Sequence, residues 1–108
     1  MLYKCKECGF VNQADKEPEK CSRCGNTNTM QQLSDEESDK IYASDMTNDI
    51  HMEIIELAMN IIYLCEEGIE INLDEQCFNI FNETKDKMWV VKQCIKAELA
   101  NHVHNQKW

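Results

Sequence analysis

Two short cysteine motifs near the N-terminus constrain this chain more than any other feature. Cys5-Lys6-Glu7-Cys8-Gly9 is followed by Cys21-Ser22-Arg23-Cys24-Gly25, with twelve residues between Cys8 and Cys21. A Cys-x-x-Cys turn aims two sulfurs at one point, and the glycine after it permits the positive φ that turns backbone N–H groups toward the sulfurs. Two such turns form a tetrahedral thiolate cage, which selects zinc or iron. We therefore expect one metal ion bound by Cys5, Cys8, Cys21 and Cys24.

Disulfide bonds are the main alternative use of these cysteines. They need an oxidising compartment, and an odd total of seven cysteines fits poorly with complete pairing. The N-terminus MLYKCKEC has no apolar signal region. The longest largely apolar stretch, Leu57 to Cys65, has nine residues, whereas a membrane-spanning helix needs about 20. We expect a cytoplasmic protein with reduced thiols.

Residues 1–33 contain too few apolar side chains to fold by burial alone. The main ones are Tyr3, Phe10, Val11 and Leu33. Segments shorter than about 40 residues usually need a metal, a disulfide or a partner to stay folded. Metal binding would then supply most of the folding energy, on the order of 10 kcal/mol or more for structural zinc.

The residues around the two motifs also follow a pattern. Tyr3 stands two residues before the first cysteine, Phe10 follows Cys8-Gly9, and residues 18–21 read Pro-Glu-Lys-Cys. In these features residues 2–33 resemble the short rubredoxin-like module of rubrerythrins. The resemblance implies an iron tetrathiolate centre that carries one electron, with the four cysteines as ligands.

Two departures from that family leave the metal open. Ser22 stands where the family usually has proline, and free-standing rubredoxins have a longer insert between the turns and more core aromatics. Both departures favour a plain zinc ribbon. Since iron and zinc both accept four thiolates, the sequence is compatible with either metal.

The remainder of the chain differs in charge and in apolar pattern. The net charge is −9, and residues 34–108 hold six lysines and sixteen acidic side chains, whereas residues 1–33 carry a net charge of +1. We place a boundary near Leu33. We expect a rubredoxin-like four-cysteine metal-binding module at 1–33, an acidic linker or short helix at 34–46, and an α-helical segment at 47–108.

The α-helical segment begins with a strong helical pattern. Its apolar residues recur at alternating intervals of four and three, which predicts a helix. Thr47 is the expected N-cap and Gly68 the expected C-terminal stop. The residues of this apolar pattern are Ile50, Ile54, Leu57, Ile61 and Leu64.

A second helix is expected after a short extended connector at residues 69–71. Asn72-Leu73-Asp74-Glu75 resembles a capping box that opens this helix. A break could fall between Asn82 and Asp86, where apolar residues thin out. The predicted helix face comprises Cys77, Phe81, Thr84, Met88, Val91, Ile95, Glu98 and His102.

The first helix is too apolar to be covered by one partner helix. Between Ile54 and Cys65 only Glu56 and Asn60 are strongly polar. The simplest arrangement that covers it is a two-fold dimer of hairpins, which makes a four-helix bundle. The expected fold class is thus a small metal-bound β knuckle, rubredoxin-like or zinc-ribbon, followed by an α-helical hairpin that dimerises.

No catalytic constellation is visible in the helical segment. Rubrerythrins build a di-iron site from Glu-x-x-His pairs, and this chain contains no Glu-x-x-His. Glu98 and His102 are four residues apart and are expected to form a hydrogen-bonded pair, with metal binding as the alternative. His51 is expected to be exposed. The remaining cysteines are expected to be small buried hydrophobes with no adjacent base: Cys65, Cys77 and Cys94.

Two functions follow as expectations. The first is a one-electron carrier that uses an iron tetrathiolate centre and recognises a protein redox partner through its acidic surface. The alternative is a zinc ribbon with a structural, interaction or regulatory role and no redox chemistry. The acidic balance argues against nucleic acid and anionic membranes as partners, because binding of phosphate groups needs clustered lysine and arginine.

Overall fold

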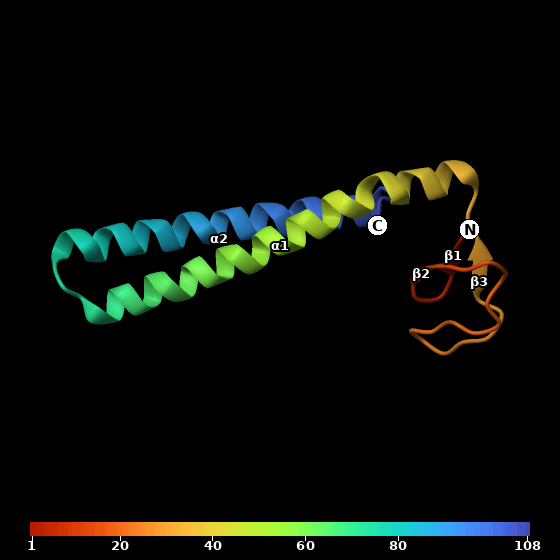
Figure 1. Cartoon of the computed structure of the whole chain (residues 1–108), viewed down its shortest axis with the longest axis horizontal. Coiled ribbons are helices and arrows are strands. Elements are labelled where there is room, and N and C mark those ends of the chain that lie inside the picture. The colour runs from red at the N-terminus through yellow and green to blue at the C-terminus, as the bar shows by residue number, and fades with distance from the viewer. The chain divides into compact units, whose positions relative to one another are not determined.

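The computed structural model describes residues 1–108 and contains three strands followed by two helices (Figure 1). The chain divides into two compact units, Met1–Tyr42 and Ala43–Trp108, and the division lies within the first helix. In chain order the elements are β1 (Leu2–Cys5), β2 (Val11–Gln13), β3 (Met30–Gln32), α1 (Asp35–Ile71) and α2 (Glu75–His104).

The N-terminal unit is built on a three-stranded antiparallel sheet with the order β2-β1-β3. β1 is central, and its last residue, Cys5, pairs with Met30 of β3. The core of this unit consists of Tyr3, Cys5, Cys21 and Met30. The predicted small β module is confirmed, and half of its core is made of cysteines.

α1 begins at Asp35, so the prediction that Thr47 caps this helix is wrong. Ser34 is the cap: its Oγ accepts from the Glu37 backbone N–H at 3.1 Å, and the Glu37 carboxylate accepts from the Ser34 N–H at 3.2 Å. This is a reciprocal capping box, and acidic side chains in the first turn favour the positive end of the helix. Residues 34–46, expected to be a linker or short helix, are thus part of one long helix.

Gly68 lies inside α1, so its prediction as the helix stop is also wrong. A Cβ built at Gly68 would lie 2.4 Å from a ring carbon of Phe81 in α2. The glycine therefore permits close approach of the two helices. α1 continues through residues 69–71, which were expected to be extended, and Asn72 follows in the left-handed conformation with φ of 47°.

α2 begins at Glu75 with Asp74 as its cap residue, two residues after the Asn72 cap that the capping-box pattern implies. Its Oδ1 accepts from the Cys77 N–H at 2.7 Å. The helix is continuous to His104, so the break that could have fallen between Asn82 and Asp86 is absent. Lys85 pairs with Glu66 of α1 across this stretch, at 3.4 Å between charged atoms.

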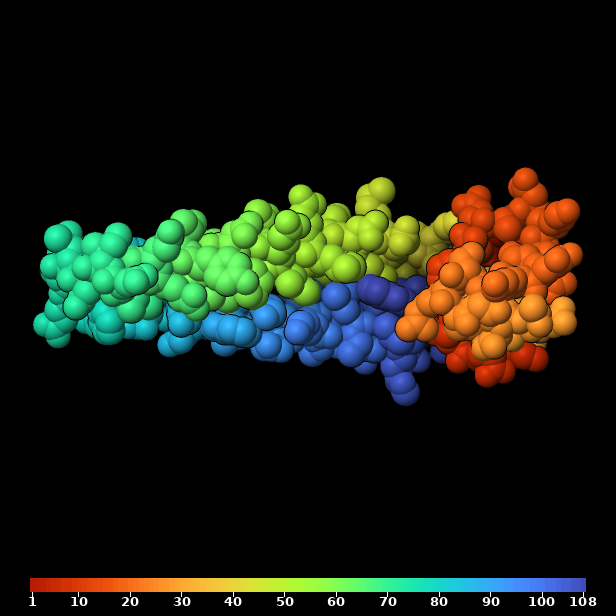
Figure 2. Space-filling model, turned by 90° about the horizontal axis from the view of Figure 1, so that it is seen from below, coloured from red at the N-terminus to blue at the C-terminus, as the bar shows by residue number.

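The two helices run antiparallel and lie side by side in the C-terminal unit (Figures 1 and 2). The buried residues of α1 in the contact are Ser44, Asn48, Ala58, Ile62 and Cys65, and on α2 only Ile95 is buried. The apolar row from Ile50 to Leu64, on which the helix prediction rested, is exposed. One partner helix covers only one face of α1. The covered face is the neighbouring row, which includes Ala58, Ile62 and Cys65. Neither helix is long and apolar enough to span a membrane.

Candidate metal centre

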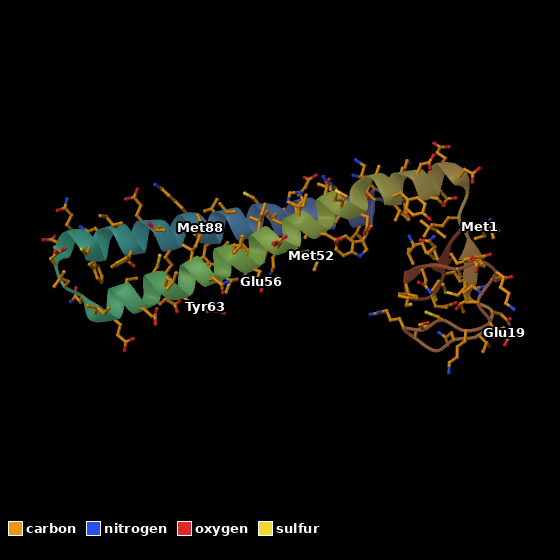
Figure 3. The ribbon with its side chains drawn as sticks, viewed as in Figure 1. Met1, Glu19, Met52, Glu56, Tyr63 and Met88 are labelled. Carbon is orange, nitrogen blue, oxygen red and sulfur yellow. The ribbon has the colours of Figure 1, made fainter.

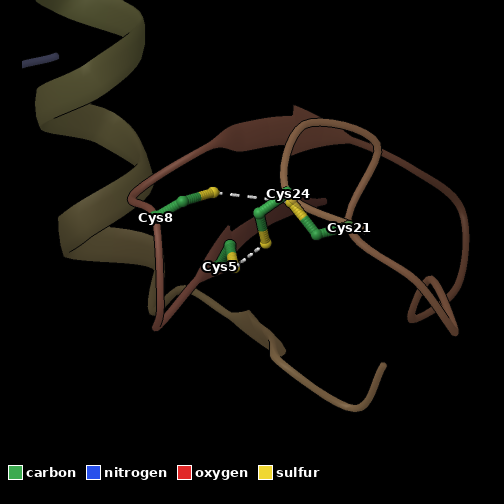
Figure 4. A group of neighbouring side chains, drawn as sticks. All are labelled: Cys5, Cys8, Cys21 and Cys24. Atoms are coloured by element: carbon green, nitrogen blue, oxygen red, sulfur yellow. Dashed lines mark hydrogen bonds between the residues drawn. The ribbon is translucent and has the colours of Figure 1, made fainter. Parts of the chain in front are cut away.

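Two similar turns position the four cysteines. In the first, the Gly9 N–H donates to the Cys5 carbonyl at 2.9 Å, and in the second the Gly25 N–H donates to the Cys21 carbonyl at 2.9 Å. Gly9 and Gly25 have φ of 79° and 78°. The positive φ predicted for both glycines is confirmed, and each turn presents its two cysteines toward the same point (Figure 4).

The structure brings all four sulfurs together. The Sγ atoms of Cys5 and Cys24 are 3.8 Å apart, those of Cys8 and Cys21 are 3.6 Å apart, and all four lie within 4.8 Å of one another (Figure 4). No disulfide joins them. A tetrahedral ion with metal–sulfur bonds of about 2.3 Å needs sulfurs about 3.8 Å apart. The four thiols therefore fit one tetrahedral metal ion.

Cys5 is prepared to be a thiolate. Its Sγ lies 3.2 Å from the hydroxyl of Thr29, a buried residue just before β3. This hydroxyl and the backbone N–H groups of Cys8 and Glu7 outweigh the effect of burial and lower the pKa of Cys5 to about 6. No sequence pattern marks Thr29, because only the pairing of β3 with β1 brings it to the sulfur.

Cys8 is stabilised as a thiolate by two different donors. The Phe10 backbone N–H contributes most to a lowered pKa of Cys8, and the Arg23 side chain adds to it. In return, the hydrogen bond to Cys8 raises the pKa of Arg23. Of the cations near the ligands in sequence, Arg23 is thus one that interacts with a sulfur.

The pKa of Cys24 shifts in the opposite direction to those of Cys5 and Cys8. The Asn26 backbone N–H favours its thiolate, but burial and the neighbouring sulfurs of Cys21, Cys5 and Cys8 outweigh it and raise the pKa of Cys24 to about 11. The Asn26 side chain also donates to Cys24 at 3.4 Å. Repulsion between neighbouring thiolates disfavours ionisation of the last thiol, and a bound cation compensates for that repulsion.

Glu98 and His102 form the predicted pair. Glu98 Oε1 lies 3.0 Å from His102 Nε2, and His102 Nδ1 is hydrogen bonded to Asn48 of α1. His51 is half-buried, with its Nδ1 unpartnered and its ring edge-on to His102, so the prediction that it is exposed is wrong. These side chains do not converge as metal ligands, since the cysteines form the one group in the chain that does.

The three remaining cysteines differ in burial. Cys65 is buried in α1 as predicted, Cys77 is half-buried, and Cys94 is exposed. The prediction of burial is therefore wrong for Cys94, which lies beside the contact between the helices and not in it.

Comparison of the chain with protein-family models, with curated proteins and with solved structures finds no match. The assignment of a metal-binding site therefore rests on the four sulfurs themselves. Their spacing and their hydrogen bonds suit a four-thiolate site for one metal ion, and sulfur geometry alone is common to iron and zinc.

Proposed function

We propose that the N-terminal unit binds one iron ion through Cys5, Cys8, Cys21 and Cys24 and carries single electrons to or from a protein partner. The closeness of the four sulfurs carries the proposal. The resemblance of residues 2–33 to rubredoxin-like modules favours iron. Bound there, iron would supply a ferric–ferrous couple in which the charge of the tetrathiolate centre changes between −1 and −2.

The residues around the sulfurs suit such a couple. Backbone N–H groups and Arg23 direct positive charge at Cys5 and Cys8, as the lowered pKa values of both cysteines indicate. Hydrogen bonds to the sulfurs stabilise the more negative, reduced form and raise the reduction potential. These donors therefore favour electron uptake.

Exposure of the site supports transfer to another protein. Cys24 is exposed and Cys8 is half-buried, whereas Cys5 and Cys21 are buried in the core. A partner can therefore approach one side of the sulfur cluster closely while the other side holds the module together. The acidic balance of the chain favours a partner with a basic surface.

A zinc ribbon is the second candidate, and the composition of the core is compatible with it. Cys5 and Cys21 pack with Tyr3 and Met30, so a metal at this site stabilises the fold whatever its valence chemistry. Zinc would serve this purpose without electron transfer. Four cysteines close the coordination sphere, which argues against a hydrolytic zinc site with an open position for water.

The metal content and colour of the protein test the two candidates. Protein isolated from its native source with iron available should contain one iron per chain and show the red colour of ferric thiolate. Dithionite should bleach the colour and reoxidation should restore it over repeated cycles. A colourless protein with one zinc per chain would contradict the electron-carrier proposal.

Matched cysteine variants separate the site from the other thiols. Cys24→Ser should lose the colour and most of the metal because it removes a ligand. Cys94→Ser changes an exposed cysteine of α2 and should keep both. Full metal content in Cys24→Ser would place the ion elsewhere.

A further inference from the structure

α1 carries two apolar rows, and α2 covers only one of them. The buried row includes Ala58, Ile62 and Cys65. The second row lies one position earlier along the chain, about 100° around the helix. Its side chains are between 38% and 62% exposed: Ile50, Ile54, Leu57, Ile61 and Leu64.

Polar side chains border the second row on one side. Glu53, Glu56 and Asn60 are exposed there. Other apolar side chains of α1 are exposed as well, such as Met52 at 52% and Tyr63 at 56%, both labelled in Figure 3. The second row differs from them in that its five apolar residues recur without interruption at helical spacing, which is the pattern of a helix that packs against two neighbours.

The same side of α2 is mixed in character. Because the two helices are antiparallel, the residues one position before each buried row lie on the same side of the hairpin. On α2, this flank includes the exposed Ile80, Val91 and Cys94, and also Glu83 and Lys87, which pair with each other at 3.0 Å. The apolar part of this face is thus formed mainly by α1, and α2 adds both apolar and charged side chains.

We propose that this face binds a second copy of the chain to form a four-helix bundle whose two-fold axis runs parallel to the helices. The length of the second row supports a helical partner, since it runs along α1 from Ile50 to Leu64. The hairpin alone buries only Ile95 of α2, so a second hairpin is needed to cover the remaining apolar surface.

The distribution of charge selects this axis. Between residues 43 and 71, α1 carries seven acidic side chains and no lysine or arginine, whereas α2 carries four lysines and four acidic side chains. A two-fold axis perpendicular to the helices would place α1 against α1 of the other copy, with like charges opposed. An axis parallel to the helices places α1 against α2 of the other copy, whose net charge is zero. All neighbouring helices are antiparallel in this arrangement.

The mass of the full-length protein in solution is the first test. Light scattering should give twice the chain mass of 12.7 kDa. Leu57→Asp places a charge in the second row and should weaken the dimer at least tenfold, whereas Asn60→Asp on the exposed polar side should leave it intact. A monomeric wild-type protein, or a Leu57→Asp protein that remains a dimer with full helical signal, would overturn the proposal.

Cross-linking tests the axis. The contacts Gly68–Phe81 and Glu66–Lys85 fix a register in which Cys94 lies near the level of Leu57. Leu57→Cys should therefore form a disulfide between two chains on mild oxidation, and Cys94→Ser in the same protein should abolish it. An interchain disulfide that persists without Cys94 would place α1 against α1, and no interchain disulfide in either protein would reject the dimer face.

Discussion

Thr29 is a buried residue beside the sulfur cluster that favours the thiolate form of Cys5. Its hydroxyl is the largest influence on the lowered pKa of Cys5, and it lies buried beside that sulfur. A thiolate that forms readily competes well against protons, so a metal held by it resists acid. Thr29 is thus a positioning residue for the first ligand.

Replacement of Thr29 by valine should make the metal more sensitive to acid. The variant keeps the side-chain shape but loses the hydroxyl, so the pKa of Cys5 should rise from about 6 toward the ordinary value of a cysteine thiol. Protons would then displace the metal at higher pH, so the pH at which half of the metal is released should rise. An acid titration followed by metal release to a chelator measures that midpoint.

Thr27→Val is the matched control, because Thr27 is an exposed threonine in the same loop. It should release metal at the wild-type pH. An unchanged midpoint in Thr29→Val would show that the hydroxyl does not stabilise the thiolate.

For the strands and helices, local patterns predicted some features and missed others for physical reasons. The cysteine turns were predictable because each is a local structure defined by spacing and one glycine. The start of α2 was predictable to within two residues, because the capping pattern of residues 72–75 contains the actual cap, Asp74. Gly68 misled the prediction, since a glycine that ends a helix and one that admits Phe81 look alike in sequence.

The start of α1 was missed for a different reason. Residues 35–46 have few apolar side chains, so no helical period marks them, although Ser34 and Glu37 form the spacing of a capping box. The row from Ile50 to Leu64 predicted a helix, but it is not the row that α2 covers. Both rows of α1 have helical spacing, and the choice between them depends on tertiary packing.

Gly68→Ala should destabilise the helical hairpin. In an exposed helix interior, this change would stabilise by about 1 kcal/mol through helix propensity. Here the new methyl group would lie 2.4 Å from the Phe81 ring, and overpacking of this kind costs about 1–3 kcal/mol. Urea unfolding followed by helical circular dichroism should give a lower free energy of unfolding.

A second substitution shows whether the Phe81 ring is responsible. Phe81→Leu should be less harmful in the Gly68→Ala background than in the wild type, because the smaller side chain leaves room for the methyl group. A Gly68→Ala protein more stable than the wild type would contradict the close contact between the helices.

The whole chain combines two units that are stabilised by different means. The N-terminal unit has a core of four residues, two of which are sulfur ligands. The C-terminal unit is a helical hairpin whose polar end is joined by hydrogen bonds, with Ser44 and Asn48 donating to the Lys107 carbonyl at 2.6 and 2.8 Å. Loss of the metal should therefore affect the two units unequally.

Metal removal should unfold the first unit and spare most of the helices. Metal binding supplies on the order of 10 kcal/mol to small modules of this kind, far more than a core of this size offers. In Cys21→Ser, the amide resonances of residues 1–33 should collapse to unfolded positions while most of the helical circular dichroism remains. Loss of all helical signal would show that the helices depend on the metal module.

X-ray absorption spectroscopy at the edge of the bound metal tests the central claim most directly. If Cys5, Cys8, Cys21 and Cys24 hold one ion, the purified protein should contain one metal per chain surrounded by four sulfur atoms at about 2.3 Å. A first shell that contains nitrogen or oxygen atoms, or a folded protein that binds no metal, would contradict it.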